Sequence, residues 1–284
     1  MNEITGGRVW LVTGASSGFG RAIAEAALHA GDTVVAGVRR LAAVDDLAAR
    51  YPGRVTAVEL DVTDGSQVAA AVAQTMLWRG RIDVLVNNAG RGLVGAVEET
   101  TERELRDLMD VHFFGPAALI RAVLPHMRAQ GSGAIVNLTS MGGRFSFAGV
   151  GAYSATKFAL EGLSEALALE VAPFGIKVLI AEPGAFRTGF AGGALRQSPA
   201  LPAYAGITGS VRADLPASDG GQPGDPAKAA DAIVAALDSD KTPLRLALGN
   251  DAADMIGAYL DDSRAEFSAW EHITRSTDYD APGR

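Results

Sequence analysis

Seven short stretches of the chain are almost entirely apolar and rich in Val, Leu and Ile, without the alternation of a half-exposed strand. Stretches of this kind are typical of strands that are buried on both faces of a sheet. They lie at residues 8–14, 33–38, 54–60, 82–90, 133–140, 176–184 and 244–249. The pattern therefore predicts a mostly seven-stranded sheet that is covered on both faces.

Longer stretches with helical spacing of apolar residues separate these strands. They lie near residues 18–30, 41–50, 64–79, 100–130, 151–173 and 226–238. The regular order of strand and helix predicts a parallel sheet with right-handed crossovers, which is an α/β, doubly wound Rossmann fold. Ligands of such folds bind at the carboxyl ends of the strands, where the strand order reverses. Functional residues are therefore expected directly after the predicted strands.

Two segments depart from this alternation. Residues 189–226 are rich in Gly, Ala and Pro and too long for an ordinary connection, so they predict a substrate-binding loop. A polar helix is expected over about 251–275, within a C-terminal helical extension at 251–284. The chain has no internal repeat and no linker, so residues 1–284 are interpreted as a single domain.

Composition narrows the classes of protein. Of the 284 residues 48% are hydrophobic and 20% charged, as in a globular chain with a substantial core. The net charge of −8, without a Lys- or Arg-rich run, argues against nucleic acid or an anionic membrane as a partner. No metal is expected, because there is no Cys and the four His lack metal-ligand spacing. The N-terminus lacks a signal-peptide pattern and no stretch of about 18 apolar residues follows, so we expect a cytoplasmic protein.

The first predicted strand runs into the glycine-rich sequence TGASSGFG. Gly14, Gly18 and Gly20 would let backbone N–H groups and a helix N-terminus approach a pyrophosphate, although the usual dinucleotide motif is G-x-G-x-x-G. The same residues match the G-x-S-x-G motif of serine hydrolases around Ser16. That motif normally follows several strands and precedes an acid and a histidine, whereas here it follows the first strand. Taken alone, the turn leaves both interpretations open.

The sequence GAYSATK at 151–157 also allows two kinds of chemistry. Tyr153 and Lys157 are four positions apart and would share one helix face, as a proton-transfer pair requires. Ser154 and Lys157 match the S-x-x-K of penicillin-recognising enzymes, but the S-D-N and K-T-G partners of that motif are missing. A free tyrosine has a pKa of about 10, and a nearby ammonium favours its phenolate. We therefore expect Lys157 to lower the pKa of Tyr153.

Six features occur together in a fixed order: TGASSGFG, LDVTD, NNAG, Ser140 at the end of a strand, YSATK and PGAFRT. In order and spacing they resemble the short-chain dehydrogenase/reductase family from about residue 8 to residue 190. The stretch 140–168 is most similar to members that act on steroids, retinoids and other secondary alcohols or ketones. The resemblance implies that Tyr153 is the acid/base and that Lys157 also holds the nicotinamide ribose. It further implies that Ser140 hydrogen-bonds the substrate oxygen.

The resemblance also implies a nicotinamide cofactor. Family members that use NAD have an acidic residue at the end of the second strand, where this chain has Val38 followed by Arg39 and Arg40. An arginine suits the 2′-phosphate of NADP, so NADP(H) is expected, unless the two arginines merely begin a solvated helix. The expected cofactor-binding residues are Gly14, Ser16, Ser17, Gly18, Phe19, Gly20, Arg39, Asp61, Val62, Asn88, Ala89, Gly90, Tyr153, Lys157, Pro183, Gly184 and Thr188.

One position departs from the family pattern. The resemblance predicts an asparagine that holds a water between the lysine and solvent, but the chain has His112 there. A histidine can donate and accept, so it could hold the same water, and His112 is a catalytic candidate on that ground. With a reference pKa of about 6.5 it could also be protonated in the working range. Alternatively, His112 marks a changed relay or a protein that has lost turnover.

Apolar residues are expected around the reacting carbon, so the expected substrate is a lipophilic small molecule. They are Phe145, Phe147, Val150, Phe190 and Tyr204. We expect an NADPH-preferring oxidoreductase that transfers a hydride between the cofactor and a lipophilic ketone or secondary alcohol. The alternative is a catalytically weak NADP(H)-binding sensor or partner protein of the same fold. The resemblance also implies a homodimer or homotetramer, built through the helices near 100–130 and 151–173.

Overall fold

A seven-stranded parallel sheet forms the centre of the protein in a computed structural model, which describes residues 7–279. The strand order is β3-β2-β1-β4-β6-β7-β9, and it reverses between β1 and β4. The strands are β1 (Val9–Thr13), β2 (Thr33–Val38), β3 (Val55–Glu59), β4 (Val84–Asn87), β6 (Gly133–Leu138), β7 (Ile176–Pro183) and β9 (Arg245–Leu248). This order confirms the predicted doubly wound Rossmann fold, with its switch point at β1 and β4.

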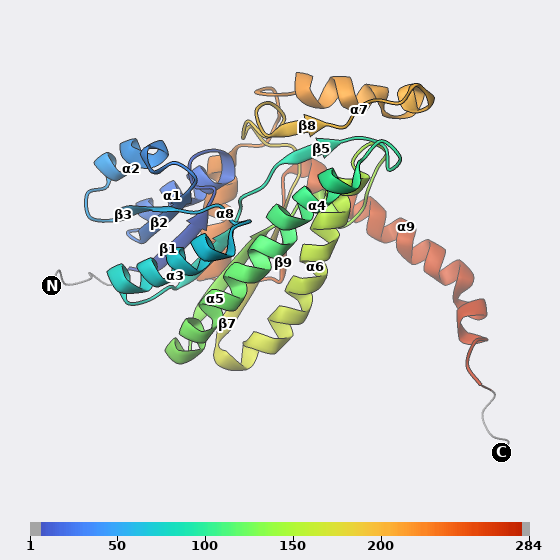
Figure 1. Ribbon diagram of the computed structural model, residues 1–284. Helices are drawn as coiled ribbons and strands as arrows, with labels where there is room; N and C mark the ends of the chain where they lie inside the picture. The colour runs from blue at the N-terminus through green and yellow to red at the C-terminus, as the bar shows by residue number, and fades with distance from the viewer. Residues whose placement is uncertain (1–6, 280–284) are drawn as a thin grey trace, which may run out of the picture.

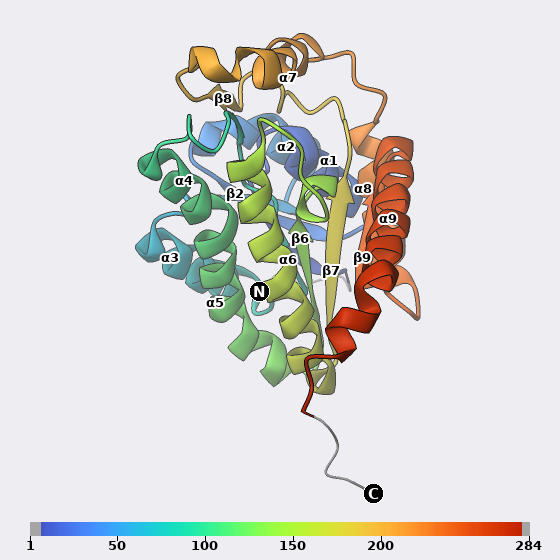
Figure 2. The same ribbon diagram turned by 90° about the vertical axis from the view of Figure 1, so that its right-hand side faces the viewer.

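Helices cover both faces of the sheet (Figure 1). Helices α1 and α8 pack together on one face, and α3, α5 and α6 cover the other. Figure 2 shows α5 and α6 side by side in front of the strands. The helices are α1 (Gly18–His29), α2 (Asp45–Arg50), α3 (Gly65–Arg79), α4 (Glu102–Met109), α5 (Gly115–Gln130), α6 (Gly151–Val171) and α8 (Pro226–Asp238).

Burial on both faces explains why the strands lack alternation. Trp10 and Val12 of β1 pack into the core on the side of α1 and α8. Val9 and Leu11 of the same strand pack into the core on the side of α3 and α5. All four side chains are completely buried. Burying a side chain of this kind stabilises the fold by roughly 1.5–3 kcal/mol, so one apolar strand supports two cores at once.

Local signals set the ends of α3. The helix begins after Asp64, whose carboxylate accepts hydrogen bonds from the backbone N–H groups of Ser66 and Gln67. It ends at Gly80, which has a φ of +72° and so adopts the left-handed conformation that glycine tolerates best. The boundary expected from the hydrophobic pattern, 64–79, therefore agrees with the capping residues of this helix.

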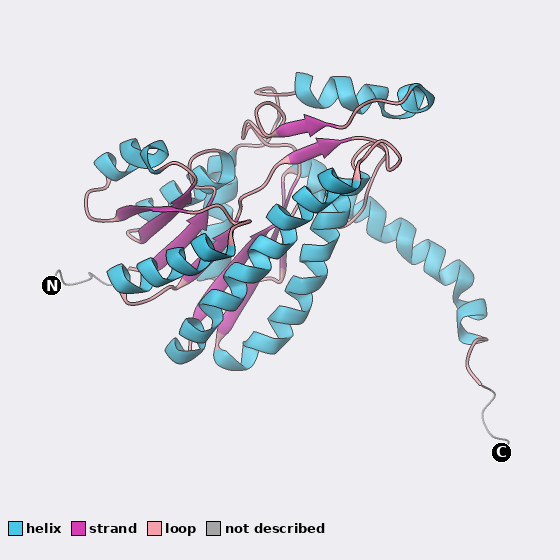
Figure 3. Cartoon of the chain, in the orientation of Figure 1, coloured by secondary structure: helices cyan, strands magenta, loops and turns pink. Residues whose placement is uncertain are grey.

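The segment 189–226 forms a small layer above the carboxyl ends of the strands (Figure 3). It contains strand β8 (Leu195–Gln197) and helix α7 (Ala205–Ala217). Strand β8 pairs in parallel with β5 (Gly92–Val94), which follows β4. The sequence pattern predicted neither strand nor this helix. Three-residue strands are too short for a periodic signal, and the Gly- and Pro-rich composition concealed α7.

A buried carboxylate anchors this layer to the rest of the protein. Glu99, which is 5% exposed, accepts hydrogen bonds from the N–H groups of Leu201 at 2.8 Å and Ala96 at 2.7 Å. Its other partner is the Arg212 guanidinium at 2.6 Å. Leu201 and Arg212 belong to the 189–226 layer, whereas Glu99 lies three residues before α4. One side chain therefore holds two points of the layer against the body.

The last helix, α9 (Asn250–Arg275), projects away from the sheet beyond its first turns (Figure 1). Only Ala252 and Ile256 of this helix are buried. Phe267 and Trp270 are 58% and 62% exposed. The helix expected over 251–275 is therefore present, and it carries large apolar side chains on its surface. Residues 280–284 of the predicted extension lie outside the described residues.

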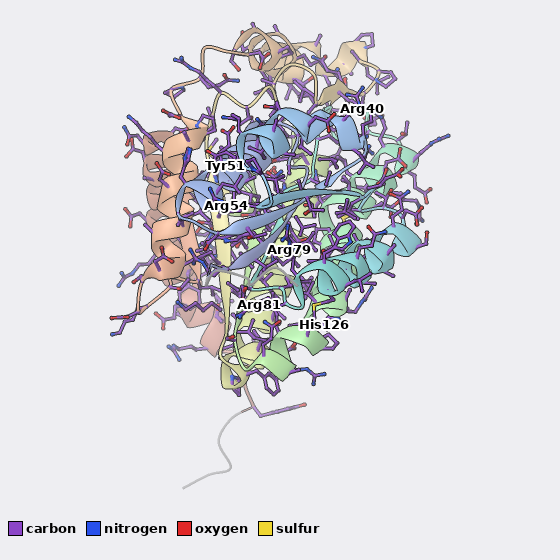
Figure 4. The ribbon with its side chains drawn as sticks, turned by 90° about the vertical axis from the view of Figure 1, so that its left-hand side faces the viewer. Arg40, Tyr51, Arg54, Arg79, Arg81 and His126 are labelled. Atoms are coloured by element: carbon purple, nitrogen blue, oxygen red, sulfur yellow. The ribbon has the colours of Figure 1, made fainter. Side chains whose placement is uncertain are left out.

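Figure 4 shows the side of the molecule that carries the edge strand β3. The Arg54 guanidinium lies 5.2 Å from the ring centre of Tyr51 and donates to the Leu28 carbonyl at 2.7 Å. Arg79 donates to the hydroxyl of Thr56, within β3, at 2.9 Å. Charged side chains beside an edge strand oppose its pairing with another sheet. The arginines on this side therefore protect the open edge of the sheet.

Candidate active site

A cavity of about 860 Å³ lies at the carboxyl ends of the central strands, beside the 189–226 layer. Its volume is in the range of small-molecule and cofactor sites. The four predicted catalytic residues and all but one of the predicted cofactor residues line it. They are Gly14, Ser16, Ser17, Gly18, Phe19, Arg39, Asp61, Val62, Asn88, Ala89, Gly90, His112, Ser140, Tyr153, Lys157, Pro183, Gly184 and Thr188. The fold thus brings together segments that are far apart in the sequence.

The glycine-rich turn after β1 forms one wall of the cavity. Gly14 and Gly18 have φ angles of +65° and +55°, which require glycine. Gly20, unlike the other residues expected to bind the cofactor, does not line the cavity. A Cβ at Gly20 would lie 2.4 Å from the Gly14 carbonyl oxygen, and the position therefore needs glycine for packing. The turn leads into the N-terminus of α1, where backbone N–H groups and the helix dipole favour a phosphate.

The end of β2 places a cation on the rim of the cavity. Val38 is buried and uncharged, whereas Arg39 is exposed and lines the cavity. Arg40 is exposed as well but does not line the cavity. The Asp61 carboxylate accepts the N–H of Thr63 at 3.0 Å, and this bond, with a smaller contribution from Arg39, lowers the pKa of Asp61. The Arg39 guanidinium is thus positioned to meet an anionic group of a ligand.

The asparagines after β4 hold the strands together. Asn87 is buried and donates to the Asn137 side chain at 2.8 Å, which joins β4 to β6. Asn88 donates from its side chain to the Thr13 carbonyl at 2.9 Å and from its backbone to the Thr13 hydroxyl at 2.9 Å. These bonds fix the end of β4 beside the end of β1. Asn87 is therefore structural, and Asn88 combines a structural role with a place in the cavity wall.

Ser140, Tyr153 and Lys157 meet at the other end of the cavity. Ser140 follows β6, and its hydroxyl accepts the N–H of Gly142 at 3.0 Å. Tyr153 lies in the first turn of α6, and its hydroxyl is near enough to the Ser140 hydroxyl for Ser140 to lower the pKa of Tyr153. Lys157 lies one turn further on, and its Nζ donates to the Leu138 carbonyl at 2.9 Å. One helix and one strand end therefore position the three predicted catalytic side chains.

Burial dominates the acid–base properties of this trio. It raises the pKa of Tyr153 to about 12, and the nearby Ser140 hydroxyl opposes the rise. It lowers the pKa of Lys157 from 10.5 to about 8, and the charge of Glu161 opposes that shift. The expectation that Lys157 lowers the pKa of Tyr153 is wrong for this arrangement, because desolvation outweighs an ammonium 5.7 Å from the ring centre. Tyr153 is therefore protonated at neutral pH, as an acid must be.

His112 lies in a π-helical segment (Asp110–Phe114) that interrupts the long helix predicted at 100–130. Its Nε2 accepts the backbone N–H of Arg91 at 3.1 Å, so its Nδ1 carries the proton and donates to the Thr156 hydroxyl at 2.8 Å. Both ring nitrogens thus have protein partners, and the expected role of this ring in holding a water is wrong. Burial lowers the pKa of His112 well below 6.5, so the expected protonation in the working range is wrong too.

Replacing His112 by Leu is expected to lower the free energy of unfolding by about 1–3 kcal/mol, because the Arg91 N–H and the Thr156 hydroxyl lose a buried partner. His112→Asn keeps a donor and an acceptor and should lose less. Urea unfolding measures both. Because the unfolded chain binds a proton at this histidine near pH 6.5 and the folded chain does not, wild type loses stability as the pH falls below that value. Both variants should show a flatter fall, and equal slopes would contradict the neutral, buried imidazole.

Apolar side chains surround the hydroxyl of Tyr153. Phe147, Val150 and Phe190 line the cavity as expected, and the Phe190 ring centre lies 5.8 Å from that of Tyr153. Three further leucines line the cavity: Leu93 of β5, Leu195 of β8 and Leu215 of α7. The sequence analysis did not predict these residues, because it did not predict the three elements that carry them.

Two aromatic residues that were expected in this wall do not line it. Phe145 stacks with Tyr259 of α9 at 5.8 Å between ring centres. Tyr204 donates its hydroxyl to Glu98 at 2.6 Å, at the surface. Both side chains thus contact residues outside the cavity wall. The apolar wall therefore comes from the short elements β5 and β8 and from α7 rather than from these residues.

The S-x-x-K alternative finds no support in the geometry. Ser154 is 1% exposed, and its hydroxyl has no hydrogen-bond partner among the described residues. The Lys157 amine is bonded to the Leu138 carbonyl instead. Ser16 of the G-x-S-x-G match lies in the first turn of the sheet, beside the helix N-terminus that suits a phosphate. Fold and site together define a nicotinamide-dependent oxidoreductase with a Ser-Tyr-Lys site.

The short chain dehydrogenase family matches residues 8–198, and the chain belongs to this family. It is 37% identical to "Oxidoreductase BOA17" of Botryotinia fuckeliana over 268 residues, which cover 94% of this chain and 98% of that protein. It is 45% identical to the 3-ketodihydrosphingosine reductase of Bacteroides thetaiotaomicron over 64% of this chain and 65% of that protein. Human 17-beta-hydroxysteroid dehydrogenase type 1 is 40% identical over 49% of this chain and 42% of its own.

Solved structures agree. A short-chain dehydrogenase from Streptomyces avermitilis has a TM-score of 0.92 and 62% identity, covering 96% of this chain and 100% of its own. A short chain dehydrogenase from Burkholderia cenocepacia in complex with NADP has a TM-score of 0.72 and 29% identity, covering 93% of this chain and 97% of its own. The protein is thus an enzyme that acts on CH–OH or C=O groups with a nicotinamide cofactor. The expected family is confirmed, and family membership favours an enzyme over the sensor alternative.

Proposed function

We propose that the protein prefers NADPH and reduces a lipophilic ketone, or oxidises the corresponding secondary alcohol. One observation carries this proposal. A single cavity has the Arg39 cation on its rim at one end, and Ser140 and Tyr153 among apolar side chains at the other. A 2′-phosphate and a carbonyl group are the chemical partners that these two ends fit.

The residues present fit a dinucleotide. The positive φ angles of Gly14 and Gly18 open the turn for a pyrophosphate at the N-terminus of α1. A Cβ at Gly18 would lie 3.0 Å from the Thr188 carbonyl oxygen, so the turn and the segment after β7 enclose the same space. Pro183, Gly184 and Thr188 would then hold the nicotinamide end. When bound, the cofactor supplies or accepts the hydride.

The protein itself handles the proton. In reduction the Tyr153 hydroxyl gives its proton to the substrate oxygen as negative charge develops there, and a group in this role contributes about 10²–10⁴-fold to rate. Ser140 donates a hydrogen bond to the same oxygen. The Lys157 ammonium stabilises the phenolate that Tyr153 becomes. A raised tyrosine pKa suits the acid role, because it keeps the proton on Tyr153 until the alkoxide forms.

Two observations support a lipophilic substrate. Leu93, Phe147, Phe190 and Leu195 give the cavity an apolar wall near the acid, although Arg91 and Arg196 also line the cavity. Two of the relatives are named for lipid-like substrates, a ketodihydrosphingosine and a 17-beta-hydroxysteroid. Both names describe a carbonyl or hydroxyl carbon on a large apolar molecule.

The proposal is tested by following NADPH oxidation in a panel of ketones with apolar chains or rings, alongside small polar ketones. Turnover of lipophilic ketones with NADPH, at a higher kcat/KM than with polar ones, is the expected result. Mass spectrometry of ligands retained by the purified protein gives an independent check. Retention of NAD without NADP, or turnover confined to polar substrates, would contradict the proposal.

A second proposal concerns assembly. The helical run Glu102–Gln130, which includes the π-helical segment, is apolar enough to span a membrane by length and composition, yet only 39% of its most apolar part is buried. Phe114 on this helix is 56% exposed, and Phe158 and Leu169 on α6 are 43% and 81% exposed. Exposed apolar surface of this kind marks interaction sites. We propose that this face meets a second copy of the chain in a homodimer or homotetramer.

Light scattering at micromolar concentration should therefore give at least twice the monomer mass of 29.3 kDa. Leu169→Glu should shift the protein toward the monomer, because a charge at the interface is costly to bury. Leu77→Glu is a matched control, because Leu77 is 82% exposed but belongs to α3 and not to either of the two helices proposed for the interface. A monomeric mass for wild type would overturn the assembly proposal.

A further inference from the structure

A cluster of buried charges lies directly behind the catalytic lysine. Glu161 is one helical turn beyond Lys157 on α6, and it is 5% exposed. Its side chain packs against the backbone of Gly143, three residues after Ser140, because a Cβ at Gly143 would lie 3.3 Å from Glu161 Oε1. Glu161 Oε2 accepts from the Arg245 guanidinium at 3.0 Å. The carboxylate is thus held one turn from Lys157 and against the segment that follows Ser140.

The second oxygen of this carboxylate has no hydrogen-bond partner. Glu161 Oε1 is buried, and no donor among the described residues bonds to it by distance and angle. The nearby Thr139 hydroxyl donates to the Ala181 carbonyl at 3.1 Å instead. A buried carboxylate oxygen without a donor is costly unless a positive charge compensates it. The Lys157 ammonium, one turn away, is a charge of the right sign.

We propose that Glu161 is a positioning residue for Lys157: its buried carboxylate supplies the negative charge that keeps the Lys157 ammonium protonated while the enzyme works. This inference rests on the proposed function, in which that ammonium stabilises the Tyr153 phenolate. The reason is energetic. Burial alone opposes a charged lysine, and among the groups around Lys157 it is the Glu161 carboxylate that opposes this effect.

The other charged groups around the pair fit this role. Arg245 from β9 holds Glu161 and also lies 3.4 Å from Glu182 of β7, and Arg144 lies 3.5 Å from Glu182. Burial, with a smaller contribution from the Glu161 charge, raises the pKa of Glu182 to about 7. Burial also raises the pKa of Glu161, and the charges of Arg245 and Arg144 oppose that rise and favour the carboxylate.

Lys157 also lies near the rings of His112 and Tyr153, which are both uncharged at neutral pH. Arg91 also acts on His112 and lowers its pKa further, so that ring stays neutral. The arginines of the cluster fix Glu161 in place. Glu161 is thus the negative group that acts on the ammonium.

The test measures Lys157 directly. The chain has four lysines, so the ε-carbon signal of Lys157 can be assigned by nuclear magnetic resonance from its loss in Lys157→Met. In wild type its titration midpoint is expected near pH 8. Glu161→Gln, which keeps the size and removes the charge, should lower that midpoint by about one unit. The alkaline limb of kcat/KM for ketone reduction should move to lower pH by the same amount.

Three further variants separate this role from a structural one. Glu165→Gln is the matched control: it lies one turn further on α6 and pairs with the same Arg245 at 2.5 Å, but its side chain is 57% exposed. It should leave the Lys157 midpoint unchanged. Glu182→Gln should not lower the midpoint, because its loss leaves Glu161 ionised. Glu161→Asp restores the charge and should recover most of the wild-type midpoint, and it serves as the test if Glu161→Gln does not fold.

An unchanged midpoint in Glu161→Gln would overturn the inference. So would an equal shift in Glu165→Gln or Glu182→Gln, because the charge would then come from the cluster in general. If Glu161→Gln does not fold, Glu161→Asp decides. A Lys157 titration midpoint in Glu161→Asp about one unit below that of wild type would then overturn the inference. The proposed function fails separately: the midpoint can shift as expected in a protein that reduces no ketone, and ketones can be reduced while the midpoint stays fixed.

Discussion

Tyr153→Phe is expected to lower kcat by about 10²–10⁴-fold, because the hydroxyl that protonates the substrate oxygen is removed. The affinity for NADPH should stay within a few-fold of wild type, since the proton is transferred only in the transition state. The phenyl ring still packs against Phe190 and His112, so the fold should persist. Steady-state kinetics on any ketone found in the panel, with fluorescence titration of NADPH, measures both quantities.

Tyr204→Phe is the matched control for this variant. It removes the same hydroxyl group from a tyrosine outside the cavity, where the partner is Glu98 at the surface. Its kcat should equal that of wild type. Near-full activity in Tyr153→Phe would show that another group delivers the proton and that the catalytic assignment is wrong.

Wild type is expected to favour NADPH over NADH by roughly 10- to 150-fold in kcat/KM. Arg39 would form a charge-assisted hydrogen bond with the 2′-phosphate, worth about 1.5–3 kcal/mol. The double variant Val38→Asp, Arg39→Ser should reverse the preference, because it replaces the cation with a carboxylate that accepts from the ribose hydroxyls and repels the phosphate. Kinetics with both cofactors at a fixed substrate concentration below KM decides this.

Arg40→Ser controls for the loss of a positive charge in the same segment. Arg40 is as exposed as its neighbour but lies outside the cavity wall, so its loss should leave the ratio almost unchanged. Equal kcat/KM for the two cofactors in wild type would refute the NADPH preference. An equal change in Arg40→Ser and Arg39→Ser would indicate a diffuse electrostatic effect instead of a contact.

The sheet was predictable because its strands are buried on both faces. A strand such as Val9–Thr13 must be apolar at every position, and seven such stretches separated by helices permit few topologies. The two strands of the small upper sheet have three residues each, and only the pairing of Gly92 with Leu195 reveals them. This pairing joins segments that are about a hundred residues apart. A local pattern in the sequence therefore cannot predict it.

The site was predictable to the extent that its chemistry depends on fixed positions. Tyr153 and Lys157 on one helix face and a serine at the end of a strand lie where the motifs placed them. The protonation states and buried charges around these residues were not predictable from the sequence. The neutral state of His112 follows from complete burial and two partners, one of them a backbone N–H, which no side-chain pattern shows. Glu161 reads in sequence as an ordinary helix residue, and only the packing of β7 and β9 buries it.

The anchoring of the 189–226 layer at Glu99 separates the enzyme into two independently variable parts. The groups that carry out the chemistry belong to the strand ends and to α6, whereas much of the apolar wall belongs to a layer held by β5–β8 pairing and by one buried ion pair. If this layer were replaced by that of a relative, the new layer would stay attached to the sheet domain provided that it kept a strand that pairs with β5 and an arginine that pairs with Glu99. Substrate range could then diversify through exchange of this layer, while cofactor and reaction type are inherited unchanged.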